Sequence, residues 1–274
     1  MPNWKPGKLK DVSNTALNII HRRGKPGRTP VVFVHGAWHG AWCWQGNFFD
    51  FFADAGHPIY ALDLRGHGDS PAVRAMRWNR IRDYADDVAQ VISECDQPPV
   101  VVGHSMGGFI TQHLLARDLP LAGACLLASA PAIGVLGTSL RILRRRPVDF
   151  ARVNLHLSLY PLVETEEHAA ALFLEPDADP EIRSLLAQKL CDESYMAFLD
   201  MLVLSLPRKP ANPPPVLVIG GAEDRVFTVT EQRKLAARFD APCHILPGTP
   251  HDIMLSRNWR TAADLILDWM GAQS

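Results

Sequence analysis

Short, continuous runs of apolar residues alternate along the chain with stretches whose apolar residues recur every three or four positions. The runs predict strands, and their unbroken apolarity indicates that most are buried on both faces. The repetition of strand and helix predicts an α/β fold with a doubly wound, mostly parallel sheet. The strands are expected at Val12–Ile20, Val31–Val34, Ile59–Leu62, Val100–Val102, Ala124–Leu127, Val216–Ile219 and Cys243–Leu246. The helices between them are expected near Gln45–Ala55, Tyr84–Cys95, Met106–Arg117, Thr230–Ala237 and Asn258–Met270.

The alternation stops between Pro131 and Pro210, where only helical patterns are found. Proline-rich stretches bound this part of the chain, and such chain continues neither a helix nor a central strand. We therefore expect residues 1–130 and 211–274 to form one core and residues 131–210 to form an inserted helical cap. A cap that leaves the carboxyl ends of the strands would cover the usual ligand crevice of such a sheet. Its helices are expected around Val148–Leu159, Glu166–Phe173, Pro180–Leu190 and Glu193–Leu204.

Composition narrows the class of protein. The 274 residues are 47% hydrophobic and 21% charged, which suits one elaborated globular domain. The net charge of −1 favours no nucleic-acid partner, and the arginine cluster Arg141–Arg146 is expected to be a solvated face. The first residues lack an apolar signal core, and no apolar stretch approaches the roughly 20 residues that span a bilayer. A cytoplasmic protein without stable membrane insertion is the expectation.

Cysteine and histidine spacing gives no sign of a metal or another cofactor. Five widely spaced cysteines are odd in number and favour reduced, buried thiols over a disulfide framework or zinc site. His35 and His39 stand four residues apart, which suits two metal ligands only on a helix. Because Gly36 and Gly40 interrupt them, this stretch is expected to be a loop, and no metal is predicted.

One serine stands in the setting of a catalytic nucleophile. Gly103-His104-Ser105-Met106-Gly107 is a GxSxG pattern between a predicted buried strand and a predicted helix. A sharp turn there would strain the serine backbone and bring strand and helix so close that Cβ atoms two residues before and after the serine would collide. Ser105 is the predicted nucleophile.

A serine hydroxyl needs a base and an acid that orients the base. Asp224 follows the strand at Val216–Ile219 and is the predicted acid, with its neighbour Glu223 as the alternative. His251 lies on a turn-rich loop ahead of the last helix and is the predicted base. The predicted oxyanion donors are the backbone amides of Met106 and Ala37, each of which would lower the barrier by roughly 3 kcal/mol.

The segments VVFVHGAWHGAWCW, ALDLRGHGDS, GHSMGG, GGAEDRV and PGTPHDIML, in this order, resemble the α/β-hydrolase superfamily. HGAWHGAWCW is particularly similar to the branch of plant methyl-ester esterases and hydroxynitrile lyases. The resemblance implies hydrolysis of carboxylic esters through an acyl-enzyme, with Ser105, Asp224 and His251 at the triad positions. The lyases carry a hydroxylated residue where Ala37 stands and a lysine where Asp252 stands, so hydrolysis is favoured over lyase chemistry.

Other functions stay open at this point. A carbon–carbon bond hydrolase or a lactonase would use the same triad, and a receptor on this fold would bind a small molecule with slow turnover. A peripheral lipase would need an apolar cap face exposed to membrane, whereas core packing is the expected use of the cap leucines. The substrate is expected to be a small or medium apolar ester. Apolar side chains of the cap and of the loop after Val34 suggest a site for an apolar acyl or alkyl group. For each of them, packing in the core is a better interpretation than contact with the substrate. The residues are Trp38, Leu155, Leu159, Tyr160, Phe173 and Phe198.

Overall fold

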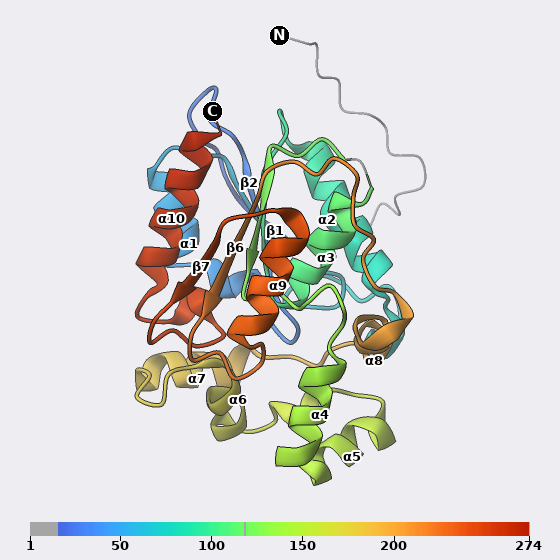
Figure 1. Cartoon of the computed structure of the whole chain (residues 1–274). Coiled ribbons are helices and arrows are strands. Elements are labelled where there is room, and N and C mark those ends of the chain that lie inside the picture. Colours follow the sequence, from blue (N-terminus) through green and yellow to red (C-terminus); the bar gives the residue numbers. More distant parts are fainter. Residues whose placement is uncertain (1–15, 118, 274) are drawn as a thin grey trace.

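The computed structural model describes residues 16–117 and 119–273, and a seven-stranded sheet forms its centre (Figure 1). The strand order is β1-β3-β2-β4-β5-β6-β7, in which β1 is antiparallel to β3 and the other neighbours are parallel. The predicted α/β fold with a mostly parallel sheet is thereby confirmed. The strands are β1 Ile19–Arg22, β2 Val31–Val34, β3 Ile59–Leu62, β4 Val100–His104, β5 Gly123–Leu127, β6 Val216–Gly221 and β7 Cys243–Leu246.

The first strand begins later than the sequence predicts. It was expected at Val12–Ile20, but it runs over Ile19–Arg22, and residues 12–15 lie outside the described residues. The apolar run does not decide its position, because β1 is an edge strand whose register is set by antiparallel pairing with β3. Its polar half is accommodated at that edge, where the ring of His21 stacks on Tyr60 with the centroids 4.4 Å apart.

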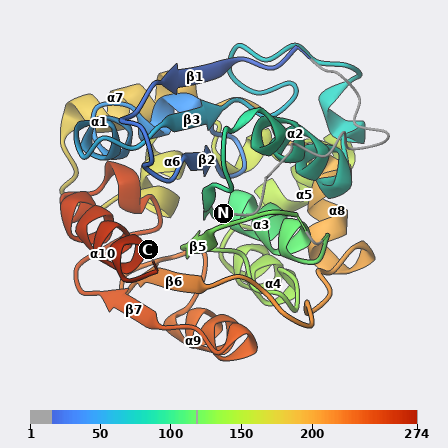
Figure 2. The same cartoon turned by 90° about the horizontal axis from the view of Figure 1, so that it is seen from above.

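Helices cover both faces of the sheet, which explains the continuous apolar strands. Figure 2 shows α1 and α10 on one face and α2, α3 and α9 on the other. In β2, Val31 and Phe33 pack into the core under α1 and α10, whereas Val32 and Val34 pack toward α2 and α3. The helices are α1 Phe48–Asp54, α2 Ile81–Glu94, α3 Met106–Leu115, α9 Val229–Phe239 and α10 Trp259–Ala272, with short turns η1 Ala41–Trp44, η2 Met76–Trp78 and η5 Ile253–Leu255.

Residues 131–210, here called the helical segment, connect β5 to β6 and lie below the sheet in Figure 1. The sequence predicts four helical stretches there and misses α4, whose residues were interpreted as an arginine cluster. The last predicted stretch is divided into α8 and a π-helical turn, η4. The elements are α4 Leu136–Arg145, α5 Pro147–His156, η3 Tyr160–Leu162, α6 Glu166–Phe173, α7 Pro180–Lys189, α8 Tyr195–Leu199 and η4 Asp200–Leu204.

Two further expectations concern thiols and membranes. All five cysteines are free, and Cys43, Cys95 and Cys125 are buried, whereas Cys191 and Cys243 are only partly so. Burial raises the pKa of Cys95 to about 12, which keeps that thiol protonated. Across residues 16–117 and 119–273, every helix is too short or too polar to cross a lipid bilayer.

A buried ion pair ties the loop after β3 to α2. The guanidinium of Arg65 donates to both carboxylate oxygens of Asp87 at 2.6–3.0 Å, and Asp87 also accepts from the Arg65 amide. The side chains are 7% and 0% exposed. Removing one partner of such a pair leaves the other charge without its counterion in a poorly solvated site.

We therefore expect Asp87→Ala to lower the free energy of unfolding by about 3–5 kcal/mol. Asp264→Ala is the matched control, because Asp264 pairs with Arg260 one helical turn away on the surface. The side chain of Arg260 is 62% exposed and that of Asp264 is 50% exposed. An exposed pair of this kind contributes about 0.5 kcal/mol or less. Urea unfolding of both variants measures the difference, and equal losses would contradict this account of the buried pair.

Candidate active site

Ser105 occupies the sharp turn between β4 and α3. Its backbone has φ 53° and ψ −115°, a left-handed conformation that costs a non-glycine residue about 1–3 kcal/mol. A Cβ atom added to Gly103 would lie 2.4 Å from the carbonyl oxygen of Gly107, and one added to Gly107 would lie 2.3 Å from that of Val34. The close approach that the sequence predicts at both glycines is therefore present, and it holds the serine in its strained turn.

The imidazole of His251 lies between Ser105 and Asp224. Its Nε2 atom is 3.0 Å from the Ser105 hydroxyl oxygen, and its Nδ1 atom is 2.8 Å from a carboxylate oxygen of Asp224. Asp224 follows β6 and His251 follows β7, so the carboxyl ends of neighbouring parallel strands bring them together. The structure thus places the three predicted residues in one hydrogen-bonded chain.

The two neighbouring carboxylates at the end of β6 point in different directions. Asp224 accepts hydrogen bonds from two backbone amides of its own loop through one oxygen and faces His251 with the other. Glu223 accepts from the amide of Thr249 at 3.0 Å and so holds the loop that carries the histidine. Of the two alternatives, the geometry favours Asp224 as the partner of the imidazole.

The surroundings of His251 raise the pKa of its imidazole. Burial alone would lower that pKa, because a charged ring loses its solvation. The charge of Asp224 and its hydrogen bond outweigh burial, Asp252 adds a smaller effect in the same direction, and the pKa lies above its usual value of 6.5. The imidazolium form is thereby stabilised.

Two backbone amides lie beside Ser105. Met106 is the first residue of α3, so its amide has no carbonyl one turn earlier to bond with. Ala37 follows Gly36, and a Cβ atom added to Gly36 would lie 3.0 Å from the Cβ of Ser105, which shows how closely the two loops approach. Both predicted oxyanion donors therefore belong to segments next to the serine.

His35 orients the peptide unit that carries the Ala37 amide. Its Nε2 accepts a hydrogen bond from the amide of Leu64 at 3.0 Å, so the ring hydrogen resides on Nδ1, which donates to the carbonyl of Gly36 at 2.8 Å. Burial, reinforced by the nearby His67, lowers the pKa of His35 and keeps its ring neutral. In a trans peptide the N–H group points away from the C=O group, so fixing this carbonyl fixes the direction of the Ala37 amide.

A second buried carboxylate, Asp252, lies beside His251. Its Oδ2 atom is 2.9 Å from Nε2 of His39, whose Nδ1 is 2.8 Å from the carbonyl of Ala37. A carbonyl oxygen only accepts, so Nδ1 of His39 donates to Ala37, and its Nε2 faces the carboxylate of Asp252. Burial opposes ionisation of Asp252, but His39 and then His104 outweigh it and lower the carboxyl pKa. No sequence pattern indicated this pair, because its partners are 213 residues apart.

Three side chains, His251 among them, are close enough together to bind a metal ion, but they already make other contacts. Ligand atoms of His104, His251 and Asp252 lie within 4.8 Å of one another. Both ring nitrogens of His251, however, already face Ser105 and Asp224. Burial and the neighbouring His251 lower the pKa of His104 to about 3, and its neutral ring donates to the carbonyl of His251 at 3.1 Å. The arrangement suits proton transfer better than cation binding.

The helical segment lies over these groups and bonds to their loops. The carbonyl of Trp38 accepts from the amide of Cys191 at 2.9 Å, and the carbonyl of Phe173 accepts from the amide of Asp252 at 3.0 Å. The ring of Phe173 stacks on His251 with the centroids 5.9 Å apart. Trp38 has φ 64°, a second strained non-glycine backbone that sequence patterns did not indicate.

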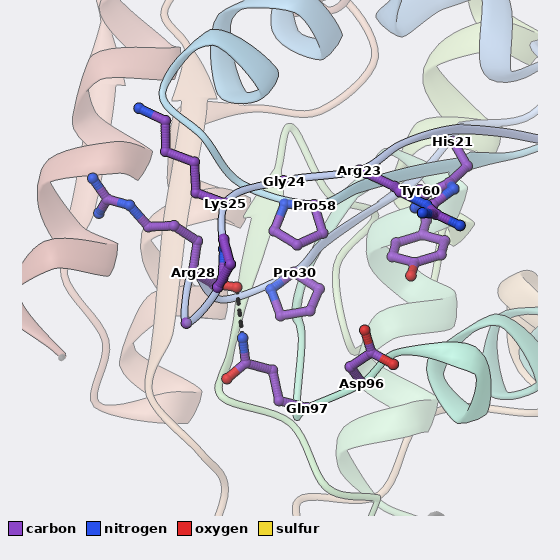
Figure 3. A pocket seen from close by; sticks show the side chains of 12 residues that line it. His21, Arg23, Gly24, Lys25, Arg28, Pro30, Pro58, Tyr60, Asp96 and Gln97 are labelled. Carbon is purple, nitrogen blue, oxygen red and sulfur yellow. Dashed lines mark hydrogen bonds between the residues drawn. The ribbon is translucent and has the colours of Figure 1, made fainter.

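Not every apolar residue proposed from the sequence lies near the serine or in the core. Phe173 and Leu159 are buried, but Leu155 is 79% exposed and Tyr160 is 39% exposed. The expectation that Leu155 lies in an apolar site or in the core is therefore wrong, because α5 turns this residue to solvent. A separate pocket of about 520 Å³ lies at the amino ends of the strands (Figure 3), and none of the candidate site residues lines it.

Comparison with known proteins is consistent with this architecture. A family model described as "Alpha/beta hydrolase family" matches residues 31–265. The chain belongs to the alpha/beta hydrolase family. An esterase from Thermogutta terrifontis has the same fold, with a TM-score of 0.74 and 19% identity over 94% of this chain and 93% of the other.

Curated relatives of this family member match over part of their length. "Probable esterase PIR7A" of Oryza sativa subsp. indica is 33% identical over 169 residues, which is 60% of each chain. "Bifunctional esterase/perhydrolase DCH" of Acinetobacter calcoaceticus is 34% identical over 43% of this chain and 44% of its own. The chain thus spans less than two thirds of the length of these relatives.

Gly107→Ala tests the close approach at the serine turn. The added methyl group would overlap the backbone of β2, so we expect the free energy of unfolding to fall by about 2–3 kcal/mol or more. Gly271→Ala near the end of α10 is the control, because a Cβ atom there meets nothing within 4 Å, and a gain of up to about 1 kcal/mol is expected. Thermal unfolding compares the two, and a neutral Gly107→Ala would contradict the packing argument.

Proposed function

We propose that this protein is a serine hydrolase that cleaves a carboxylic ester through an acyl-enzyme. The observation that carries the proposal is the hydrogen-bonded chain from Ser105 through His251 to Asp224. This is the arrangement that makes a weakly nucleophilic hydroxyl reactive toward an acyl group. Names of relatives such as the rice esterase support the ester as the substrate class.

In the proposed mechanism, His251 takes the proton of Ser105 as the serine oxygen attacks the ester carbonyl. The amides of Met106 and Ala37 would then donate to the oxyanion of the tetrahedral intermediate. Asp224 would stabilise the imidazolium, which passes its proton to the leaving alcohol. Water, activated by the same imidazole, attacks the acyl-enzyme and releases the acid, and Ser105 regains its proton.

We propose that the helical segment acts as a cap on this site and selects a small or medium apolar ester. In support, Ser105 is 8% exposed and His251 is 1% exposed beneath the segment. Phe173 and Trp38, whose ring centroids are 5.7 Å apart, supply apolar surface next to the imidazole. An apolar, water-poor site strengthens hydrogen bonds to the oxyanion. The five free cysteines favour a reducing compartment such as the cytoplasm.

Ser105→Ala should lower kcat for a nitrophenyl ester by about 10⁴-fold or more, because no other group in the proposed mechanism forms the acyl-enzyme. Wild type should react with a fluorophosphonate at the peptide that contains Ser105, and the variant should not. Ser184→Ala, on α7 of the helical segment, is the control and should retain labelling and turnover. Retained esterase activity in Ser105→Ala would falsify the nucleophile assignment, and a single turnover by wild type would favour a receptor.

The pH dependence of kcat/KM tests the role of His251. The base must be neutral, so the rate should fall on acidification through a pKa above the usual 6.5, in the direction that Asp224 imposes. Asp252→Asn removes a second negative charge that raises this pKa, so the acid limb should move to lower pH. An unmoved limb in this variant, measured with a soluble ester, would contradict the electrostatic contribution assigned to Asp252.

A further inference from the structure

One helix of the helical segment turns its apolar face toward solvent. Leu136, Leu140 and Leu143 recur at the spacing of one face of α4, and they are 50%, 43% and 38% exposed. Thr138 and Ser139 are the buried residues of the helix, and Ile142 packs against the core. The expectation that the leucines of this segment serve core packing is therefore wrong for α4. These three leucines thus stand in solvent, where an ordinary surface helix carries polar side chains.

The chain around this face is strongly basic. Residues 133–156 contain five arginines and one aspartate, in a chain whose net charge is −1. Arg141 is paired with Glu231, and Arg146 with Asp149. Arg144 and Arg145 are exposed, and within the described part of the chain no carboxylate lies within ion-pair distance of either.

The exposed α4 face, defined as Leu136, Leu140 and Leu143, is apolar and is flanked by Arg144, while Arg145 lies at the end of the helix on its other side. We propose that it docks this protein on the surface of a membrane rich in anionic lipid. The leucines enter the boundary between headgroups and acyl chains, and Arg144 binds lipid phosphates or carboxylates beside them. Arg145, on the other side of the helix, adds to the attraction of the anionic surface. The positive charge of the arginines indicates an anionic partner, whereas an apolar face alone would fit many kinds of partner.

Charge also argues against a second copy of the chain as the partner. A two-fold contact through this face would pack it against the same face of a second copy. That contact would carry Arg144 and Arg145 of both copies, and the defined face offers no carboxylate to balance their charge. An anionic lipid surface supplies the missing negative charge.

The position of α4 gives this docking a use beyond the proposed reaction. The residues leading into α4 touch the serine turn, because the amide of Ala130 donates to the carbonyl of Ser105 at 3.1 Å. Val135, immediately before the helix, packs in one apolar cluster with Ala37 and Met106. Docking through α4 would therefore hold the helical segment, which covers the candidate site, against the lipid, in which apolar esters dissolve.

Sedimentation of the whole chain with vesicles tests the proposal without any turnover, so its result is independent of the esterase assignment. Binding is expected to vesicles of phosphatidylcholine with phosphatidylglycerol and to be far weaker with phosphatidylcholine alone. Leu136→Ser/Leu140→Ser/Leu143→Ser and, separately, Arg144→Glu/Arg145→Glu should each weaken binding by about tenfold or more. Activity on a soluble short-chain ester should not change in either variant.

Arg23→Glu/Arg28→Glu is the matched control, because it changes net charge equally at the pocket on the other end of the strands (Figure 3). It should bind vesicles as wild type does, and circular dichroism should show all variants folded. Equal binding by wild type and the Arg144→Glu/Arg145→Glu variant would overturn the proposal. The proposal would also be overturned if the wild-type protein bound neither kind of vesicle and formed a dimer that the leucine replacements convert to a monomer.

Discussion

The close approach of the serine turn to β2 is the constraint on which the site depends. Gly107 lies so near the carbonyl of Val34 that no side chain fits between them, and this contact presses α3 against the sheet. With the helix start fixed there, Ser105 must adopt its left-handed backbone, and its hydroxyl is held above the end of β4. The same contact brings the loop after β2 beside the serine. The proposed nucleophile and the proposed oxyanion donors therefore share one packing contact, whose strain the surrounding core sustains.

Buried histidines then fix the loops that the sheet brings together. His35 holds the carbonyl of Gly36, and His39 holds that of Ala37, so two successive carbonyls of the proposed oxyanion loop are tied back. His39 reaches on to Asp252, the residue after the base. The loop that would bind the oxyanion and the loop that carries the imidazole are thus joined by a buried ion pair. A change in either loop is expected to be transmitted to the other through this contact.

The sequence predicted the sheet and the turn at Ser105, because both depend on local signals. Continuous apolar runs locate the strands, and glycines on both sides of Ser105 indicate the turn. It did not separate Asp224 from Glu223 with certainty, since the direction of a loop side chain depends on tertiary hydrogen bonds. For the same reason, the sequence did not predict the ion pair of His39 with Asp252 or the strained backbone of Trp38. Long-range pairs leave no periodic pattern.

The failure at α4 has a different physical origin and is more informative. Periodicity predicts that an apolar face is buried, because burial is its usual use in a soluble domain. In α4 the leucine spacing is regular, yet that face points outward, whereas Phe173 of α6 supplies the aromatic contact above His251. The helical segment therefore separates two uses of apolar surface, one facing inward to the imidazole and one facing outward to solvent. An exposed leucine face lowers solubility. Its position beside Arg144 and Arg145, which have no ion-pair partner among the described residues, favours a surface that is covered when the protein works.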